Sequence, residues 1–246
     1  ANIPNALLRG RTGTRRVLMV HEDKGNVRVR DLQKRFADFL IRRLYSRADL
    51  IIAVSHGIRR SLIELYGLPG ERIVVIYNPI DTGQIERASA EALPPEWAKI
   101  VERPTVVSVG RLTLPKGQWH LLRAFPAVRQ RVPEAQLVLL GDGDLEPYLR
   151  NLASELGLGN CVHFLGFQAN PFQLWARARV CAVSSIWEGF GNVIPESLAL
   201  GVPVVEMVAS KNRGIKELVT RVIGLARKEI PYQPRLPRIA SDHQDV

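Results

Sequence analysis

Two glutamates, Glu188 and Glu196, frame the stretch SSIWEGFGNVIPE, with Gly189, Gly191 and Pro195 between them. In a single helix the two carboxylates would point about 80° apart, so they would neither share a face nor oppose each other. The glycines and the proline instead predict a loop that becomes a helix at about Pro195, with one carboxylate on each part. This arrangement suits a ligand with two separated hydroxyl-bearing parts and a phosphate bound by backbone N–H groups between them. The alternative for Glu196 is compensation of the helix dipole, which needs no ligand.

Two cations form a second candidate. In the stretch VGRLTLPKGQ, Arg111 and Lys116 flank Pro115 and are followed by Gly117 and a predicted helix. Two cations beside the N-terminus of a helix are well placed to hold a diphosphate. A solvated charged loop explains the pair equally well, so these residues alone do not decide.

Two glycine-bearing turns follow later predicted strands. In LGDGDLEP, Gly141 and Gly143 permit a tight turn, but they do not make a full GxGxxG fingerprint, so ligand contact is the lesser expectation. In FLGF, Gly166 and Phe167 could present backbone to a nucleobase, or they could simply end a strand. The position of these turns is their most informative property, because ligands of doubly wound sheets bind outside the carboxyl ends of the strands.

The elements that would position these residues alternate between short β-branched runs and longer helical patterns. This alternation predicts βαβ units around parallel sheets. In the first part we expect three strands and two helices, at about 16–22, 50–55 and 73–77 and at about 27–47 and 57–67. In the second part we expect five strands, at 105–110, 136–140, 161–165, 180–184 and 202–207. Four helices are expected among them, at 117–131, 145–156, 172–177 and 196–200.

The chain therefore divides into two domains of the α/β class. An Ala-, Glu- and Pro-rich stretch over 88–104 predicts the boundary. We expect a partial Rossmann-like domain over 1–95, because three strands are few for this fold, and a fuller Rossmann-like domain over 104–228. Residues 229–246 contain three prolines without any periodicity, which predicts an extended or disordered tail.

Composition limits the class of protein. The 246 residues are 46% hydrophobic and 24% charged, which is typical of folded globular domains. Lys and Arg number 34 against 24 for Asp and Glu, and the resulting net charge of +10 favours an anionic partner. Nucleotides, polyphosphates, nucleic acids and anionic membranes all meet that description.

Cysteine usage and apolar runs indicate the compartment. Cys161 and Cys181 lie in apolar strand-like runs without metal-binding spacing, so we expect reduced core residues rather than ligands or a disulfide. No apolar run approaches the ~20 residues that a transmembrane helix needs. The N-terminus also lacks a basic segment followed by a long apolar one. We therefore expect a cytoplasmic protein, with peripheral contact at the inner face of a membrane as an open alternative.

Taken together, the motifs resemble a known family. VGRLTLPKG, GDG, FLGF and EGFGNVIPE with SLALGVPVV match, in order and spacing, the retaining nucleotide-sugar glycosyltransferases of family 4, which have the GT-B fold. The likeness covers about 103–205, and the two glutamates look like that family's E-x7-E motif. The stretch LYSRADLIIAVSHGIRRSLIELYGLPGERIVVIYNPID is similar to the second half of the family's N-terminal domain.

The resemblance implies a role for each candidate residue. Arg111 and Lys116 would hold the diphosphate of the donor, Glu188 would contact the transferred sugar, and Glu196 would bind the ribose hydroxyls. The remaining donor contacts would come from Phe190, Gly191 and Asn192 along the sugar and phosphate and from Gly166 and Phe167 near the base. Cations at a leaving diphosphate stabilise its developing charge, so we expect no metal and no cofactor apart from the donor substrate. The resemblance implies a UDP-sugar as that donor.

The resemblance also bears on mechanism and partners. The family retains anomeric configuration through same-face attack, so Glu188 need not be a nucleophile. His21 matches a cleft-facing histidine of many members, with an ordinary strand-end residue as the alternative. The helix at 27–47 has apolar residues at helical spacing and many arginines, so its default interpretation is a domain helix with a solvated basic face. Membrane contact is the alternative, because basic amphipathic helices bind anionic lipids and family members often modify lipid-linked acceptors.

Departures from the family leave three hypotheses. The first half of the N-terminal domain and the final helices have no counterpart here, and the loop EMVASKNRGIKELV differs in length. The leading hypothesis is a shortened glycosyltransferase acting on a glycan or lipid-linked acceptor in polysaccharide or glycolipid synthesis. The second is a non-catalytic subunit that binds sugar nucleotides and needs a partner chain or a second copy; an exposed apolar edge on the first domain would favour it. The third, a nucleic-acid binder, rests on charge alone and lacks basic motifs interleaved with aromatics.

Overall fold

A computed structural model describes residues 15–21, 31–206 and 219–224. The chain forms two compact units. The first unit comprises residues 1–79 together with 187–191, and the second comprises 80–186 together with 192–246.

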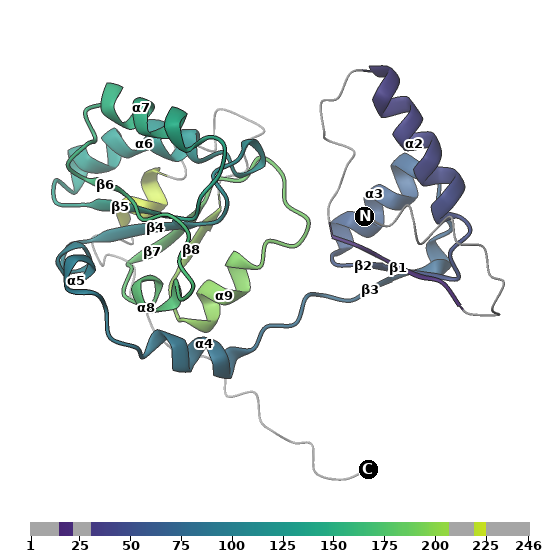
Figure 1. Ribbon diagram of the computed structural model, residues 1–246, viewed down its shortest axis with the longest axis horizontal. Helices are drawn as coiled ribbons and strands as arrows, with labels where there is room; N and C mark the ends of the chain where they lie inside the picture. Colours follow the sequence, from purple (N-terminus) through teal and green to yellow (C-terminus); the bar gives the residue numbers. More distant parts are fainter. Residues whose placement is uncertain (1–14, 22–30, 207–218, 225–246) are drawn as a thin grey trace, which may run out of the picture. The chain divides into compact units, whose positions relative to one another are not determined.

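The first unit contains a three-stranded parallel sheet in the order β1-β2-β3. Its strands are β1 (Val17–Val20), β2 (Leu50–Ala53) and β3 (Ile73–Val75), and its helices are α2 (Asp31–Tyr45), α3 (His56–Tyr66) and the short 3-10 helix η2 (Gly70–Arg72). Helices α2 and α3 lie on the same side of the sheet (Figure 1). Alternate strand residues such as Leu18 and Ile51 point toward them and are buried with Leu44 and Leu62.

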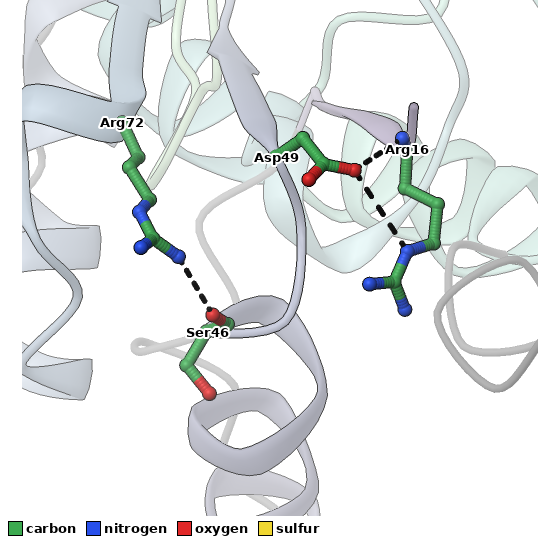
Figure 2. Close-up of polar contacts among 4 residues, drawn as sticks. All are labelled: Arg16, Ser46, Asp49 and Arg72. Carbon is green, nitrogen blue, oxygen red and sulfur yellow. Dashed lines mark hydrogen bonds and ion pairs between the residues drawn. The ribbon is translucent and has the colours of Figure 1, made fainter. Parts of the chain in front are cut away.

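Polar contacts at two places hold these elements in register. Ser55 caps α3, because its hydroxyl accepts a hydrogen bond from the N–H of Ile58 at 3.2 Å. The turn between α2 and β2 is held from two sides (Figure 2): the Asp49 carboxylate accepts from the backbone N–H of Arg16 at 2.6 Å, and the guanidinium of Arg72 donates to the Ser46 carbonyl at 3.3 Å. The turn therefore connects to the starts of both outer strands.

The second unit contains a five-stranded parallel sheet in the order β6-β5-β4-β7-β8. The strands are β4 (Thr105–Val109), β5 (Gln136–Leu140), β6 (Val162–Phe164), β7 (Val180–Val183) and β8 (Val204–Glu206). Its helices are α4 (Thr82–Ser89), α5 (Pro95–Val101), η3 (Leu114–Lys116), α6 (Gln118–Arg131), α7 (Glu146–Glu155), α8 (Phe172–Trp175) and α9 (Val193–Ala199). One apolar core lies between the sheet and α6 and α7, and a second lies on the opposite face, against α5 and α8.

The predicted fold class is confirmed. The chain is of the α/β class, both sheets are parallel, and the first sheet has only three strands in the described residues. Each strand expected from the sequence is present, shorter at one or both ends except for β5, whose predicted bounds are those observed. The helix expected at about Pro195 begins at Val193, so Pro195 lies in its first turn, where proline is tolerated.

The structure differs from the sequence analysis between residues 80 and 104. We expected the first domain to extend to 95 and the stretch 88–104 to be a boundary, whereas this region forms α4 and α5 and groups with the second unit. Asp81 caps α4 by accepting from the N–H of Gln84 at 2.8 Å. The end of α4 is then held by Asn170, whose amide donates to the Ala88 carbonyl at 2.8 Å.

Two expectations lie outside the described residues. The predicted tail at 229–246 and most of the loop EMVASKNRGIKELV fall there. Within the described part of the chain, no helix combines the length and the apolar character needed to cross a membrane.

Candidate functional site

The loops that follow β4 and β7 are hydrogen-bonded to each other at the carboxyl edge of the second sheet. The N–H of Ile186 donates to the Pro115 carbonyl at 2.8 Å, and the Ser184 hydroxyl donates to the Lys116 carbonyl at 3.0 Å. Gly117 follows in the left-handed conformation, with φ of 61°, and a Cβ there would overlap the carbonyl oxygen of Ser184. A glycine is thus required where the loop turns into α6.

The loops that follow β4, β5 and β6 are joined in the same way. Leu112 donates to the Asp142 carbonyl at 2.6 Å, and Gly141 donates to the Gly166 carbonyl at 2.8 Å. Gly141 and Gly143 have φ of 136° and 152°, and a Cβ on either would overlap backbone of the loop after β4. The GDG turn is therefore explained by close packing between loops, without any ligand.

The two cations lie on this braced loop. Arg111 is exposed, and its carbonyl accepts from the side-chain amide of buried Gln118 at 2.9 Å. Lys116 is half-buried, and its aliphatic stem passes over Gly110, where a Cβ would lie 3.6 Å from Cε. Because the loop is hydrogen-bonded to the loops after β5 and β7, the backbone that carries both cations is held at the end of β4.

Glu196 lies in the first turn of α9, in the same unit. Its side chain is half-buried, and this burial raises the pKa of the carboxyl above its ordinary value. Asn192, at the N-cap position, is exposed, and its carbonyl accepts from the N–H of Glu196 at 3.1 Å. The next residue, Ser197, anchors the helix by donating to the Val202 carbonyl at 3.0 Å.

Four predicted site residues belong to the first unit. They are His21, Glu188, Phe190 and Gly191, because residues 187–191 group with residues 1–79. The Ser55 hydroxyl donates to the Gly189 carbonyl at 2.8 Å, and a Cβ on Gly189 would overlap the carbonyl oxygen of His21. Gly189 is therefore needed for this segment to approach the end of β1.

The side chains of this segment differ in their surroundings. The ring of Phe190 packs against Tyr77, with centroids 5.5 Å apart. His21 is exposed, Glu188 is half-buried and Gly191 is buried. Phe190 is thus partly a packing residue of the first unit, a role that the sequence pattern did not indicate.

The structure separates the predicted residues into two groups. Six lie at the carboxyl edge of the second sheet: Arg111, Lys116, Gly166, Phe167, Asn192 and Glu196. Phe167 is 73% exposed, as a residue available for stacking would be. The sequence analysis missed Gln118 and Ser184, which position the cation loop. A buried polar residue at the end of an apolar run is the pattern that could have revealed Ser184.

The side chains at the carboxyl edge of the second sheet also determine which ligands can bind there. Arg111 and Lys116 can neutralise phosphate charge, and Glu196 can accept hydrogen bonds from hydroxyl groups. Among the residues that the structure describes, no group of three or more His, Cys, Asp and Glu side chains could hold a metal ion. The expectation of a site without metal stays a prediction.

Two family models match the chain. The model described as Glycosyl transferases group 1 matches residues 103–227, and the model described as Glycosyltransferase Family 4 matches residues 2–84. The first match spans the whole set of strand-end loops in the second unit. The second match spans β1, β2 and β3 and their helices.

Several curated relatives are similar to this chain over about two thirds to three quarters of its length. The N-acetylgalactosamine-N,N'-diacetylbacillosaminyl-diphospho-undecaprenol 4-alpha-N-acetylgalactosaminyltransferase of Campylobacter jejuni is 35% identical over 68% of this chain and 43% of its own length. The GDP-mannose-dependent alpha-(1-6)-phosphatidylinositol monomannoside mannosyltransferase of Mycolicibacterium smegmatis is 31% identical over 73% of this chain and 48% of its own length. The chain thus spans about half the length of the curated relatives it matches.

A solved structure supports the fold. The Anabaena protein HepE, crystallised with UDP, superposes with a TM-score of 0.65 at 24% identity, over 87% of this chain and 66% of HepE. This similarity shows the GT-B type of fold. The bound UDP is a property of HepE.

Proposed function

Because the chain belongs to the group 1 glycosyl transferases, we propose that it transfers a sugar from a nucleotide-sugar donor to a glycan or lipid-linked acceptor. We take a UDP-sugar as the first donor to test, since HepE was crystallised with UDP. GDP-mannose is the second, since the Mycolicibacterium relative is named for it. The Campylobacter relative is named for a diphospho-undecaprenol acceptor, which motivates a lipid-linked acceptor here.

One observation carries the proposal. The loop with Arg111 and Lys116 is hydrogen-bonded to the loops after β5 and β7, so the backbone that carries the two cations is held at the carboxyl edge of the second sheet. Glu196 lies in the first turn of α9 at this edge and has a half-buried carboxyl group. Cations beside a leaving group stabilise the negative charge that develops on it in the transition state. This edge is suited to a nucleoside diphosphate that leaves during the reaction.

The roles of the residues follow from that assignment. Arg111 and Lys116 bind the diphosphate, and Glu196 accepts hydrogen bonds from the ribose hydroxyls. The base lies near Gly166 and Phe167, and the backbone of Asn192 lies along the phosphates. Each of these contacts is a proposal for the second unit.

The resemblance to family 4 assigns four further residues to the sugar. Glu188 and His21 contact the transferred sugar, and Phe190 and Gly191 line it. The acceptor attacks on the face from which the diphosphate leaves, and its proton passes to a leaving phosphate oxygen. The configuration at the anomeric carbon is then retained without a covalent intermediate on Glu188.

Donor turnover tests this function. The full chain is incubated with UDP-glucose, UDP-N-acetylglucosamine and GDP-mannose, each with a lipid diphosphate or a short glycan, and released nucleotide is measured together with the product's anomeric configuration by NMR. We expect Arg111→Ala and Lys116→Ala each to lower kcat by about 10²- to 10³-fold, and Arg123→Ala, on the exposed side of α6, to have no effect. EDTA should leave the rate unchanged. A rate that depends on added divalent metal, or an inverted product, would contradict the mechanism.

A second candidate function has its own observation. On the face of the first sheet away from α2 and α3, all strand residues are apolar, and Val17 and Val74 are exposed. Parallel sheets normally bury both faces, so such a face favours a nucleotide-sugar-binding subunit that works with a partner chain or a second copy. The molecular mass of the protein in solution, measured together with its turnover, distinguishes the two candidate functions. A monomer that transfers sugar supports the first function, and an inactive chain that binds nucleotide supports the second.

A further inference from the structure

The solvent-facing side of α2 carries two large aromatic side chains. Apolar residues at helical spacing favour a domain helix whose apolar side meets the core, and Leu44 is indeed buried. Phe36 and Phe39, however, are 64% and 56% exposed. Residues three apart lie on one side of a helix, so the two rings form a neighbouring pair on the outer surface.

Two arginines follow this pair on the helix. Arg42 and Arg43 lie in the last turn of α2, and both are exposed. The Arg42 guanidinium donates to the Leu65 carbonyl at 2.8 Å, which brings α3 alongside, and the side chain of Leu65 is 47% exposed. We call Phe36, Phe39, Leu65, Arg42 and Arg43 the α2 surface. It combines three exposed apolar side chains with two arginines within the described residues of the first unit.

We propose that the α2 surface binds the surface of an anionic lipid bilayer. The two phenylalanine rings and Leu65 insert at the level of the headgroups, and Arg42 and Arg43 contact lipid phosphates. Scattered exposed apolar residues are ordinary on proteins, but adjacent aromatics flanked by arginines are the composition of helices that lie in a membrane interface.

Charge decides between a membrane and an apolar protein partner. The chain carries a net charge of +10, which attracts it to anionic lipid over distances beyond contact. An interface with an apolar protein groove would bury two arginines without phosphate partners, at a desolvation cost. At a bilayer surface the guanidinium groups stay hydrated among the headgroups, while the phenylalanine rings are removed from water. The proposal concerns binding only and does not depend on sugar transfer.

Co-sedimentation of the full chain with vesicles tests the proposal. One set of vesicles contains phosphatidylglycerol and phosphatidylcholine, and the other contains phosphatidylcholine alone. Phe36→Ser/Phe39→Ser removes the rings, and Tyr148→Ser/Leu198→Ser removes two exposed apolar side chains of the second unit as a matched control. Arg42→Gln/Arg43→Gln removes two charges, and Arg123→Gln/Arg179→Gln removes two exposed charges elsewhere. Thermal melts followed by circular dichroism verify that each variant is folded.

The expected results are specific to the α2 surface. The wild type binds anionic vesicles much more tightly than neutral ones, and high salt weakens the binding. The Phe36→Ser/Phe39→Ser variant should lower the partition coefficient by about tenfold or more. Each arginine near the surface strengthens binding by about fivefold, so Arg42→Gln/Arg43→Gln should lower the partition coefficient by about 25-fold. Both control variants should leave the partition coefficient unchanged.

Three results would overturn the proposal. They are equal binding to both kinds of vesicle, binding by the α2 variants at the wild-type level, and an equal loss in the control pairs. An equal loss in the arginine control pair would mean that net charge alone causes the attraction, and an equal loss in the apolar control pair would mean that the exposed apolar residues act without regard to their position. If the phenylalanine variant failed to fold, vesicle binding by the arginine variant and by its control would still test the proposal.

Discussion

Glu196 illustrates how one side chain connects stability with function. Its carboxyl is half-buried in α9, and burial raises its pKa above the ordinary value of about 4.3. The ribose hydroxyls proposed to bind here would donate stronger hydrogen bonds to the ionised form than to the protonated one. The free protein therefore bears the cost of holding this carboxylate partly out of water.

The pH dependence of stability should show that cost. Between the unfolded pKa and the raised folded pKa, the folded state holds a proton that the unfolded state has lost, so the wild-type free energy of unfolding falls as the pH rises through this window. Glu196→Gln does not titrate. We expect it to gain stability relative to the wild type across the window and to keep that gain at neutral pH. Denaturant melts at several pH values measure the difference, and a constant difference would be inconsistent with the raised pKa.

The two cysteines allow a second prediction at this scale. Both are free and buried, and burial raises the pKa of the Cys181 thiol to about 12, with the neighbouring Glu196 adding to the effect. Burial also raises the pKa of Cys161. We expect neither thiol to react with a disulfide reagent at pH 8 in the folded protein and both to react in guanidinium chloride. Rapid reaction of the native protein would contradict the described packing of β7.

At the scale of the elements, the glycine of the GDG turn is predicted to matter for folding more than for binding. Gly141 has φ of 136°, and a Cβ there would overlap the Gly110 carbonyl. Gly141→Ala should lower the free energy of unfolding by about 1–3 kcal/mol or more. Gly159→Ala is the matched control, because its Cβ would enter open space, and it should stay within about 0.5 kcal/mol of the wild type. Chemical denaturation measures both, and equal stabilities would contradict the loop packing.

Much of the element order could be predicted from sequence, for a physical reason. Buried parallel strands are continuous apolar runs, such as the one that forms β5, and they stand out from their surroundings. Helix α4 was missed because it depends on capping by Asp81 and on Asn170, a residue distant in sequence. The exposure of Phe36 and Phe39 was missed too, because periodicity alone cannot tell which apolar residues of a helix meet a core.

The candidate site was predicted to a similar extent. The positions of Arg111, Lys116 and Glu196 at strand ends follow from the βα rhythm. The hydrogen bonds from Ser184 and Gln118 that brace the cation loop were not predicted, because a pattern of strands and helices does not show which loop a polar side chain will contact. The grouping of residues 187–191 with the first unit likewise depends on tertiary packing.

At the scale of the whole molecule, the two units differ in completeness. The second has a five-stranded sheet with a core on each face, and the first has a three-stranded sheet with one face apolar and partly exposed. The donor site as proposed draws its phosphate and ribose contacts from the second unit. Nucleotide binding is therefore the property of the chain that depends least on the first unit.

Calorimetric titration with UDP and then GDP tests the central claim most directly. We expect one of them to bind the wild type, Arg111→Ala and Glu196→Ala to weaken binding by about tenfold or more, and Arg123→Ala to bind as the wild type does. At about 100 times the dissociation constant, the nucleotide should also raise the free energy of unfolding by ~2.7 kcal/mol. Failure of both nucleotides to bind, or equal binding by all variants, would contradict the assignment of the carboxyl edge of the second sheet as a nucleotide site.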